Sequence, residues 1–143
     1  MAEPVTIIMI EDDTGHARLI EKNIRRAGVT NEIKHFDYGG AAMDFLLGNK
    51  AHATPLLILL DLNLPDMSGT DILEKIKADE KLHRAPVIVL TTTDDKVEIQ
   101  RCYDLGCNVY ITKPVNYESF ADAIRQLGLF LAVIQVPDPE TLK

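Results

Sequence analysis

The sequence predicts an α/β protein built on an open, doubly wound sheet of five parallel strands, and three observations support this. Five short apolar runs alternate with five segments of helical periodicity, which implies right-handed crossovers and helices on both faces of a parallel sheet. At 143 residues the chain suits one domain and falls short of the about 200 residues that a (β/α)₈ barrel needs. Two apolar runs end directly in acids, at Glu11 and at Asp61, as strands do when they deliver side chains to a ligand site.

The chain begins with a strand and a helix. Residues 5–10 are apolar and stop at a run of acids, so we expect a buried strand. Apolar residues then recur on one face over residues 15–27, which predicts a helix. Thr14 or Asp13 is suited to cap this helix and Gly28 to end it.

The middle of the chain repeats the pattern twice. Residues 32–36 are short and partly polar, as an edge strand should be. A helix follows over residues 40–48, and residues 56–60 are apolar throughout, which is typical of a central buried strand. A loop with turn-forming residues leads to a third helix over residues 70–78.

The last third completes the alternation. Residues 86–90 predict the fourth strand, and the helix after it runs to about residue 105, where Gly106 occupies the position of a C-terminal cap. Residues 108–111 predict the fifth strand. The fifth helix starts near Asn116 and carries its apolar residues at helical spacing.

The composition limits the partners. A formal net charge of −7 argues against nucleic acid, because phosphate binding needs a basic surface. No apolar stretch approaches the roughly 20 residues of a membrane span, so we expect no membrane partner. The N-terminus lacks the charged and apolar regions of a signal peptide. We therefore expect a cytoplasmic protein.

Residues with complementary chemistry follow four of the strands, and parallel strands bring them to one edge of the sheet. Asp61 follows the central strand and is suited to be a nucleophile that forms an aspartyl phosphate. Asp12 and Asp61 are suited to bind Mg²⁺ directly, with Glu11 holding it through water. Lys113 is placed to pair with Asp61 and then with the phosphoryl group, to which Thr91 donates a hydrogen bond. No glycine-rich nucleotide cradle is present, which argues against bound ATP as the donor.

Two other functions fit parts of this pattern. A Mg²⁺-dependent phosphatase would also use Asp61 as its nucleophile on free substrates, but Asn63 stands where a second carboxylate would serve as acid–base catalyst. A flavodoxin-like FMN protein would share the fold. The acids at the strand ends would repel its phosphate, and the loops lack a phosphate cradle.

With these residues in place, the chain resembles the receiver domain of two-component response regulators. The motifs that carry the resemblance span most of the chain in matching order: residues 10–13, 60–69, 90–92 and 110–114. The resemblance implies a flavodoxin-like (βα)₅ fold with strand order 2-1-3-4-5. It implies a receiver domain over residues 1–135, followed by a tail over 136–143 without an output domain. Such a domain is a phosphoacceptor rather than a multiple-turnover enzyme.

The same resemblance implies a role for each site residue. Asp61 would be phosphorylated by a partner histidine kinase, with Lys113 beside it. Glu11 and Asp12 would be the acid pair that binds Mg²⁺ together with Asp61, and the backbone carbonyl of Asn63 would complete the protein ligands.

The resemblance also implies a conformational switch. Thr91 would move toward the phosphoryl group, and Tyr110 would turn into the space behind it, which alters the surface of the fourth helix, fifth strand and fifth helix. The Lys113–Pro114 peptide bond would be cis, as in most of this family.

A narrower resemblance concerns the partner. Residues 102–114, with 90–93, are similar to the small regulators that partner cyanobacterial and bacterial phytochromes, which implies a phytochrome as the kinase. An apolar C-terminal segment suggests a homodimer. Its residues are Leu129, Phe130, Leu131, Val133, Ile134 and Val136.

Overall fold

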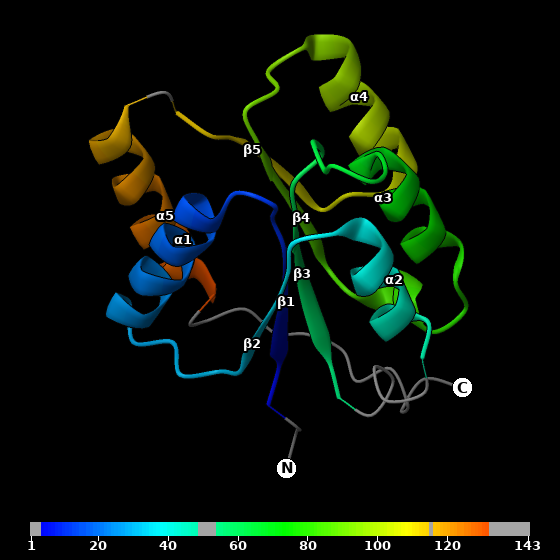
Figure 1. Ribbon diagram of the computed structural model, residues 1–143, viewed down its shortest axis with the longest axis horizontal. Helices are drawn as coiled ribbons and strands as arrows, with labels where there is room; N and C mark the ends of the chain where they lie inside the picture. Colours follow the sequence, from blue (N-terminus) through cyan, green and yellow to red (C-terminus); the bar gives the residue numbers. More distant parts are fainter. Residues whose placement is uncertain (1–3, 49–53, 115, 132–143) are drawn as a thin grey trace.

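The computed structural model describes residues 4–48, 54–114 and 116–131, in which strands and helices alternate (Figure 1). The elements are β1 (Thr6–Ile10), α1 (Thr14–Arg26), β2 (Ile33–Phe36), α2 (Gly39–Leu46), β3 (Leu56–Leu60), α3 (Gly69–Ala78), the 3₁₀ helix η2 (Leu82–Arg84), β4 (Val87–Thr91), α4 (Lys96–Leu105), β5 (Val109–Thr112) and α5 (Tyr117–Leu131). All ten predicted elements are present, and their bounds differ from the predicted ones by at most two residues.

The five strands form one parallel sheet in the order β2-β1-β3-β4-β5, which confirms the predicted topology. Strands β1, β3 and β4 are buried along their whole length, whereas β2 and β5, at the two edges, are partly exposed. Strands β1 and β3 pair in register from Thr6–Leu56 to Ile10–Leu60. The residues that follow these two strands therefore emerge level with each other.

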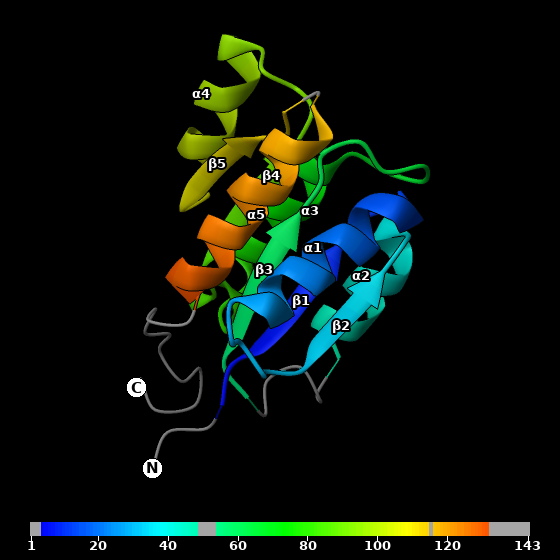
Figure 2. The ribbon, with the colours of Figure 1, turned by 90° about the vertical axis from the view of Figure 1, so that its left-hand side faces the viewer.

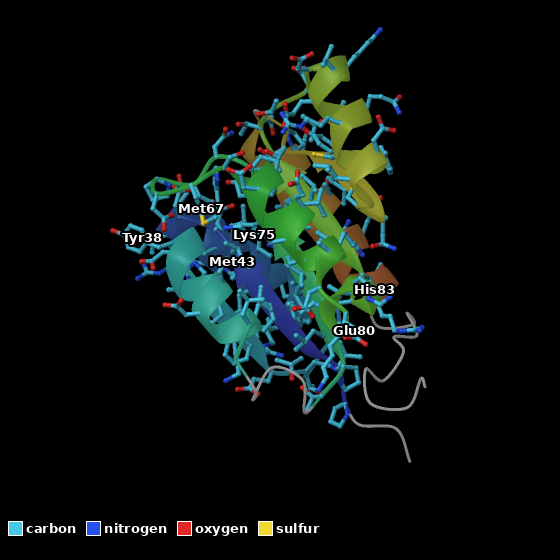
Figure 3. All side chains as sticks on the ribbon, turned by 90° about the vertical axis from the view of Figure 1, so that its right-hand side faces the viewer. Tyr38, Met43, Met67, Lys75, Glu80 and His83 are labelled. Carbon is cyan, nitrogen blue, oxygen red and sulfur yellow. The ribbon has the colours of Figure 1, made fainter. Side chains whose placement is uncertain are left out.

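Helices cover both faces of the sheet. Helices α1 and α5 lie side by side on one face (Figures 1 and 2), and α2, α3 and α4 cover the other. Because strand side chains alternate between faces, Ile8 and Ile58 pack beneath α2 and α3, whereas Met9 and Leu59 pack beneath α1 and α5. Figure 3 turns the face covered by α2, α3 and α4 to the reader, with Met43 of α2 and Met67 of the β3–α3 loop labelled.

Local signals in the sequence account for most helix ends. The Asp13 carboxylate accepts a hydrogen bond from the His16 backbone N–H at 3.0 Å, so Asp13 rather than Thr14 is the N-cap of α1. Gly106 ends α4 with a left-handed φ of 107°, which favours glycine. The 3₁₀ helix η2 was not predicted. It forms because the Asp79 carboxylate accepts from the backbone N–H groups of Lys81 and Leu82, at 2.8 and 2.9 Å.

Two predictions fall largely outside the described residues. The tail over residues 136–143 lies there, as do Val133, Ile134 and Val136 of the expected dimer segment. Leu129, which is described, is 56% exposed. Across the described ranges, no helix has the length and apolar character needed to cross a bilayer.

Candidate functional site

Three carboxylates meet at the carboxyl ends of β1 and β3. Glu11 and Asp12 follow β1, and Asp61 follows β3, where its backbone N–H donates to the Ile10 carbonyl at 3.0 Å. One carboxylate oxygen from each of the three acids lies within 4.8 Å of the others. Glu11 and Asp61 are buried, whereas Asp12 is exposed. The cluster is therefore enclosed by the protein on one side and open to incoming groups on the other.

Lys113 supplies the positive charge of this cluster. It follows β5, and its backbone N–H donates to the Thr91 carbonyl of β4 at 2.6 Å, which fixes where the side chain begins. The side chain is buried, and its ammonium forms an ion pair with Glu11 and, at 3.1 Å, another with Asp61. Removing the lysine would leave two buried carboxylates without a compensating charge, which makes this cluster costly to break.

Burial sets the electrostatics of Glu11. Loss of hydration raises the pKa of Glu11 to about 7, and the hydrogen bond from Lys113 opposes this rise. The second Glu11 oxygen accepts from the Asp13 backbone N–H at 3.1 Å. The carboxylate is thus held by hydrogen bonds yet retains a proton more readily than an exposed glutamate.

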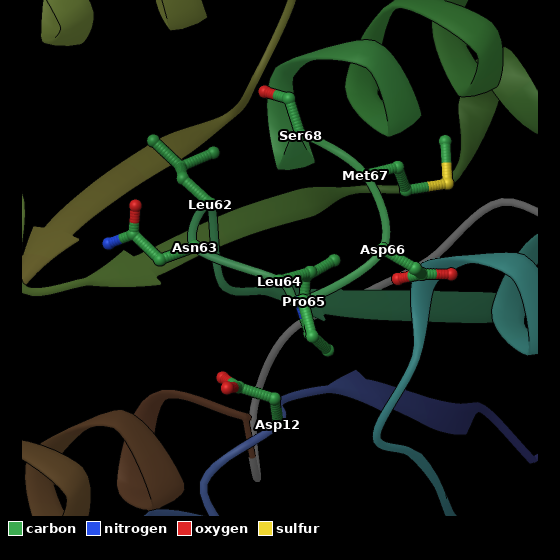
Figure 4. Close-up of a pocket in the computed structure, with 8 residues that line it drawn as sticks. All are labelled: Asp12, Leu62, Asn63, Leu64, Pro65, Asp66, Met67 and Ser68. Atoms are coloured by element: carbon green, nitrogen blue, oxygen red, sulfur yellow. The ribbon is translucent and has the colours of Figure 1, made fainter.

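The β3–α3 loop lies beside Asp61. One Asp61 oxygen accepts from the Asn63 backbone N–H at 3.1 Å, and the Asn63 side-chain amide donates to the hydroxyls of Thr91 and Thr93 at 3.4 and 3.3 Å. The residues of this loop, with Asp12, line a recess of about 560 Å³ (Figure 4). Asp12 is thus the member of the acid cluster that faces this recess.

Contacts with two helices fix this loop. The Asp66 carboxylate accepts from the backbone N–H groups of Gly39 and Gly40 at the start of α2, each at 2.8 Å, and these bonds lower the pKa of Asp66. At its other end, Gly69 packs so closely that a Cβ there would lie 2.5 Å from the Asp61 carbonyl oxygen and the Leu62 Cα. A glycine is therefore required where α3 starts.

Thr91 and Tyr110 both reach the segment after β4. Thr91 is fully buried at the end of its strand. The Tyr110 hydroxyl donates to the Thr93 carbonyl at 2.6 Å, and burial raises the pKa of Tyr110 to about 12. Tyr110 already packs against the core in this structure.

The predicted convergence of the site side chains at one edge of the sheet is observed, whereas three contacts there were not predicted. The structure brings Glu11, Asp12, Asp61, Asn63, Thr91 and Lys113 to one edge of the sheet, and the Tyr110 hydroxyl reaches the segment after Thr91. The missed contacts are the Lys113–Glu11 pair, the His16 ring beside Lys113, and Asp66 at α2. Only the closeness of His16 to the acids along the chain is visible in the sequence.

The prediction of a cis Lys113–Pro114 bond is wrong. No peptide bond is cis among the described residues, which include both partners of this one. The trans form is the intrinsically favoured isomer even before proline, by about 0.5–1 kcal/mol.

The acid cluster suits a hard divalent cation. Its oxygens are carboxylates, the ligands that Mg²⁺ prefers, and they converge closely enough for one ion to contact them. Two of them already face a lysine, which reduces their mutual repulsion before an ion arrives.

The sequence and the fold are both similar to those of known receiver domains. The family of response regulator receiver domains matches residues 7–125. A receiver domain structure from Rhodospirillum rubrum is 64% identical, with a TM-score of 0.90, over 93% of this chain and 97% of that one.

Two further relatives are linked by name to signalling. Response regulator Rcp1 of Synechocystis sp. is 33% identical over 138 residues, which cover 94% of each chain. Its Mn²⁺-bound crystal structure has a TM-score of 0.85 at 32% identity, over 94% of this chain and 99% of that one. The phosphorylated cyanobacterial phytochrome response regulator RcpA has a TM-score of 0.84 at 36% identity, over 95% of this chain and 99% of that one.

Proposed function

The chain belongs to the response regulator receiver domain family, and from this membership we propose that it accepts a phosphoryl group on Asp61 from a partner histidine kinase. The observation that carries the proposal is the placement of Asp61. Its carboxylate is buried between a lysine 3.1 Å away and two further acids whose oxygens lie within 4.8 Å. A neighbouring lysine and two further acids that can bind a cation suit an aspartate that accepts and releases a phosphoryl group.

The proposed reaction is a direct displacement at phosphorus. An oxygen of ionised Asp61 attacks the phosphorus of a phosphohistidine, a P–O bond forms, and the P–N bond breaks. The departing imidazole nitrogen keeps the electron pair and takes up a proton. The ammonium of Lys113 and the hydroxyl of Thr91 stabilise the charge on the transferred oxygens.

Glu11, Asp12 and Asp61 are the side chains that would hold Mg²⁺, and the Asn63 carbonyl is proposed as the remaining protein ligand. When bound, the ion neutralises charge on the phosphoryl oxygens. The exposed position of Asp12, at the recess, supports entry of both the ion and the phosphoryl group from that side.

We further propose that phosphorylation changes the surface formed by α4, β5 and α5. Thr91 and Tyr110 are suited to this role, because Thr91 lies beside Asn63 and Tyr110 bonds to the carbonyl of Thr93. A shift of Thr91 toward the phosphoryl group would act on the segment that Tyr110 holds.

The names of Rcp1 and RcpA support a phytochrome as the kinase, and we propose this partner for the chain in a cytoplasmic pathway. We also propose a homodimer through the C-terminal part of α5 and the residues after it. Mass measurement in solution, with and without residues 132–143, tests the dimer; a monomer in both cases would contradict it.

Phosphotransfer tests the function. The purified chain is incubated with Mg²⁺ and an autophosphorylated phytochrome histidine kinase, and Asp61→Asn is the matched control. We expect stoichiometric, acid-stable and alkali-labile labelling of the native chain and none of the variant. Failure of transfer from phytochrome kinases and from acetyl phosphate alike would overturn the proposal, and many turnovers of a phosphate ester would indicate a phosphatase instead.

A further inference from the structure

His16, in the first turn of α1, directs its ring at the ammonium of Lys113. Its Nδ1 lies 3.1 Å from the lysine Nζ. The ring also meets Phe120 of α5 edge-on, with centroids 5.3 Å apart and an angle of 83° between the planes. Its backbone N–H is bound by the N-cap Asp13. The position of the imidazole is therefore fixed by two helices.

The contact defines the role of each atom. A lysine ammonium donates hydrogen bonds and accepts none, so His16 Nδ1 is the acceptor, which assigns the ring proton to Nε2. The nearest Asp13 oxygen lies 3.9 Å from Nδ1, beyond hydrogen-bonding distance. In this contact His16 is therefore the acceptor and Lys113 the donor.

His16 completes the hydrogen bonding of the lysine. An ammonium has three N–H donors, and Lys113 has three contacts: Glu11, Asp61 and His16. In the proposed function Asp61 becomes phosphorylated and Glu11 takes part in binding Mg²⁺, so both carboxylates change their interactions during the reaction. His16 is the partner of Lys113 that belongs to neither event.

We propose that His16 is a positioning residue that keeps the Lys113 ammonium in place while its two carboxylate partners engage the ion and the phosphoryl group. The inference rests on the proposed phosphoryl acceptance by Asp61. Without His16, one lysine N–H in a buried site has no partner, and the ammonium is free to move away from the oxygens on which charge develops. Small displacements of a catalytic group lower rates strongly.

Three variants of the full chain separate positioning from mere packing. His16→Leu keeps an apolar contact for Phe120 but has no acceptor. His16→Asn places an amide oxygen at the same number of bonds from the backbone as Nδ1, so an acceptor is restored. His16→Ala removes both and serves in place of leucine if that variant fails to fold. Thermal unfolding shows whether each variant is folded and how stable it is.

The rate of phosphorylation by acetyl phosphate at saturating Mg²⁺ is the first readout, with Mg²⁺ affinity measured separately by calorimetry. We expect His16→Leu to lower the rate about tenfold and His16→Asn to recover most of that loss, with Mg²⁺ affinity nearly unchanged in both. Equal phosphorylation rates in the His16→Leu and His16→Asn variants would overturn the inference. So would a loss of rate that simply parallels the loss of thermal stability among the variants.

The second readout needs no phosphorylation. The side-chain ammonium resonance of Lys113, assigned with Lys113→Met, reports its hydrogen bonds in the resting chain. We expect it to be retained in His16→Asn and lost or strongly shifted in His16→Leu; an unchanged resonance in the leucine variant would contradict the inference. A native chain that is labelled neither by acetyl phosphate nor by a phytochrome kinase would refute the proposed function, while this resonance still decides whether His16 holds the lysine.

Discussion

Lys113 and Lys77 lie at opposite ends of the same sheet, and they are bound in different ways. At the carboxyl end, Lys113 contacts the carboxylates of Glu11 and Asp61. At the amino ends of β4 and β5, Lys77 donates to the carbonyls of His83 and Ala85 at 3.1 and 3.0 Å. It also reaches the Asn108 side-chain oxygen at 3.4 Å. Burial lowers the pKa of Lys77.

The difference separates a functional lysine from a structural one. Carbonyl groups satisfy the donors of Lys77 without adding charge, so this contact ties α3 to the starts of two strands and has little to exchange. The partners of Lys113 are acidic side chains whose contacts a phosphoryl group or a cation can rearrange. We therefore expect the reaction at the end of the sheet where the partners of Lys113 are charged. At the other end, the neutral partners of Lys77 stabilise the fold.

Among substitutions that test this difference between Lys113 and Lys77, we expect Lys113→Met to have the largest effect. We expect phosphorylation of Asp61 by acetyl phosphate to slow by about 10²–10³-fold, because a donor at the developing charge is lost. Mg²⁺ binding should become tighter, because the acids lose their neighbouring positive charge. Single-turnover labelling and calorimetry measure the two effects. Weaker Mg²⁺ binding together with slower labelling would indicate a collapsed site instead.

The same substitution at the other end is the matched control. Lys77→Met keeps the apolar stem but leaves the carbonyls of His83 and Ala85 without this donor. We expect the free energy of unfolding to fall by about 2 kcal/mol, with the phosphorylation rate unchanged. Urea unfolding and acetyl phosphate labelling test this. A slowed rate in a folded Lys77→Met chain would show that the two ends are not separable.

The sequence is informative about these two ends to different degrees. The carboxyl end is predictable, because Glu11, Asp61 and Lys113 each stop or follow an apolar run, and parallel strands bring such positions together. The amino end is not, because Lys77 looks like any lysine on a helix, and its partners are backbone carbonyls that carry no side-chain signal.

The same distinction explains what was missed in the site. The Lys113–Glu11 pair and the His16 contact depend on how far each side chain reaches and in which direction. Asp66 depends on the approach of a loop to the start of α2. None of these is a periodic feature of the sequence, whereas strand order and helix faces follow directly from periodicity.

The two ends should also respond to pH in different ranges. Burial raises the pKa of Glu11 to about 7, and a cation must displace that proton to bind. Mg²⁺ affinity should therefore fall roughly tenfold between pH 8 and pH 6. In the Glu11→Gln variant, Mg²⁺ affinity should be weaker at every pH in this range and should not depend on pH. Calorimetry at several pH values measures both, and an equal pH dependence in the two chains would rule out Glu11 as its source.

The smallest effect is expected at alkaline pH, on the free energy of unfolding. It concerns cysteines near the amino ends of β4 and β5. Burial raises the pKa of Cys102 to about 11 from an ordinary 9.0, and it also raises that of Cys107. Between those values the unfolded chain releases a thiol proton that the folded chain keeps, so stability falls as pH rises. Lys77, whose folded pKa is lowered, opposes this fall because there the folded chain releases its proton first.

Cys102→Ala isolates the thiol contribution. From pH 8 to pH 10 under reducing conditions, the native chain should lose about 1 kcal/mol more unfolding free energy than the variant does, after each is referred to its own value at pH 8. Phosphorylation at pH 8 should be the same in both, since Cys102 is a buried residue of α4 and is not one of the residues that form the acid cluster. Parallel pH profiles in urea unfolding would mean that the thiol of Cys102 titrates alike in both states. The alkaline response of this end would then be expected from Cys107 and Lys77, which interact electrostatically.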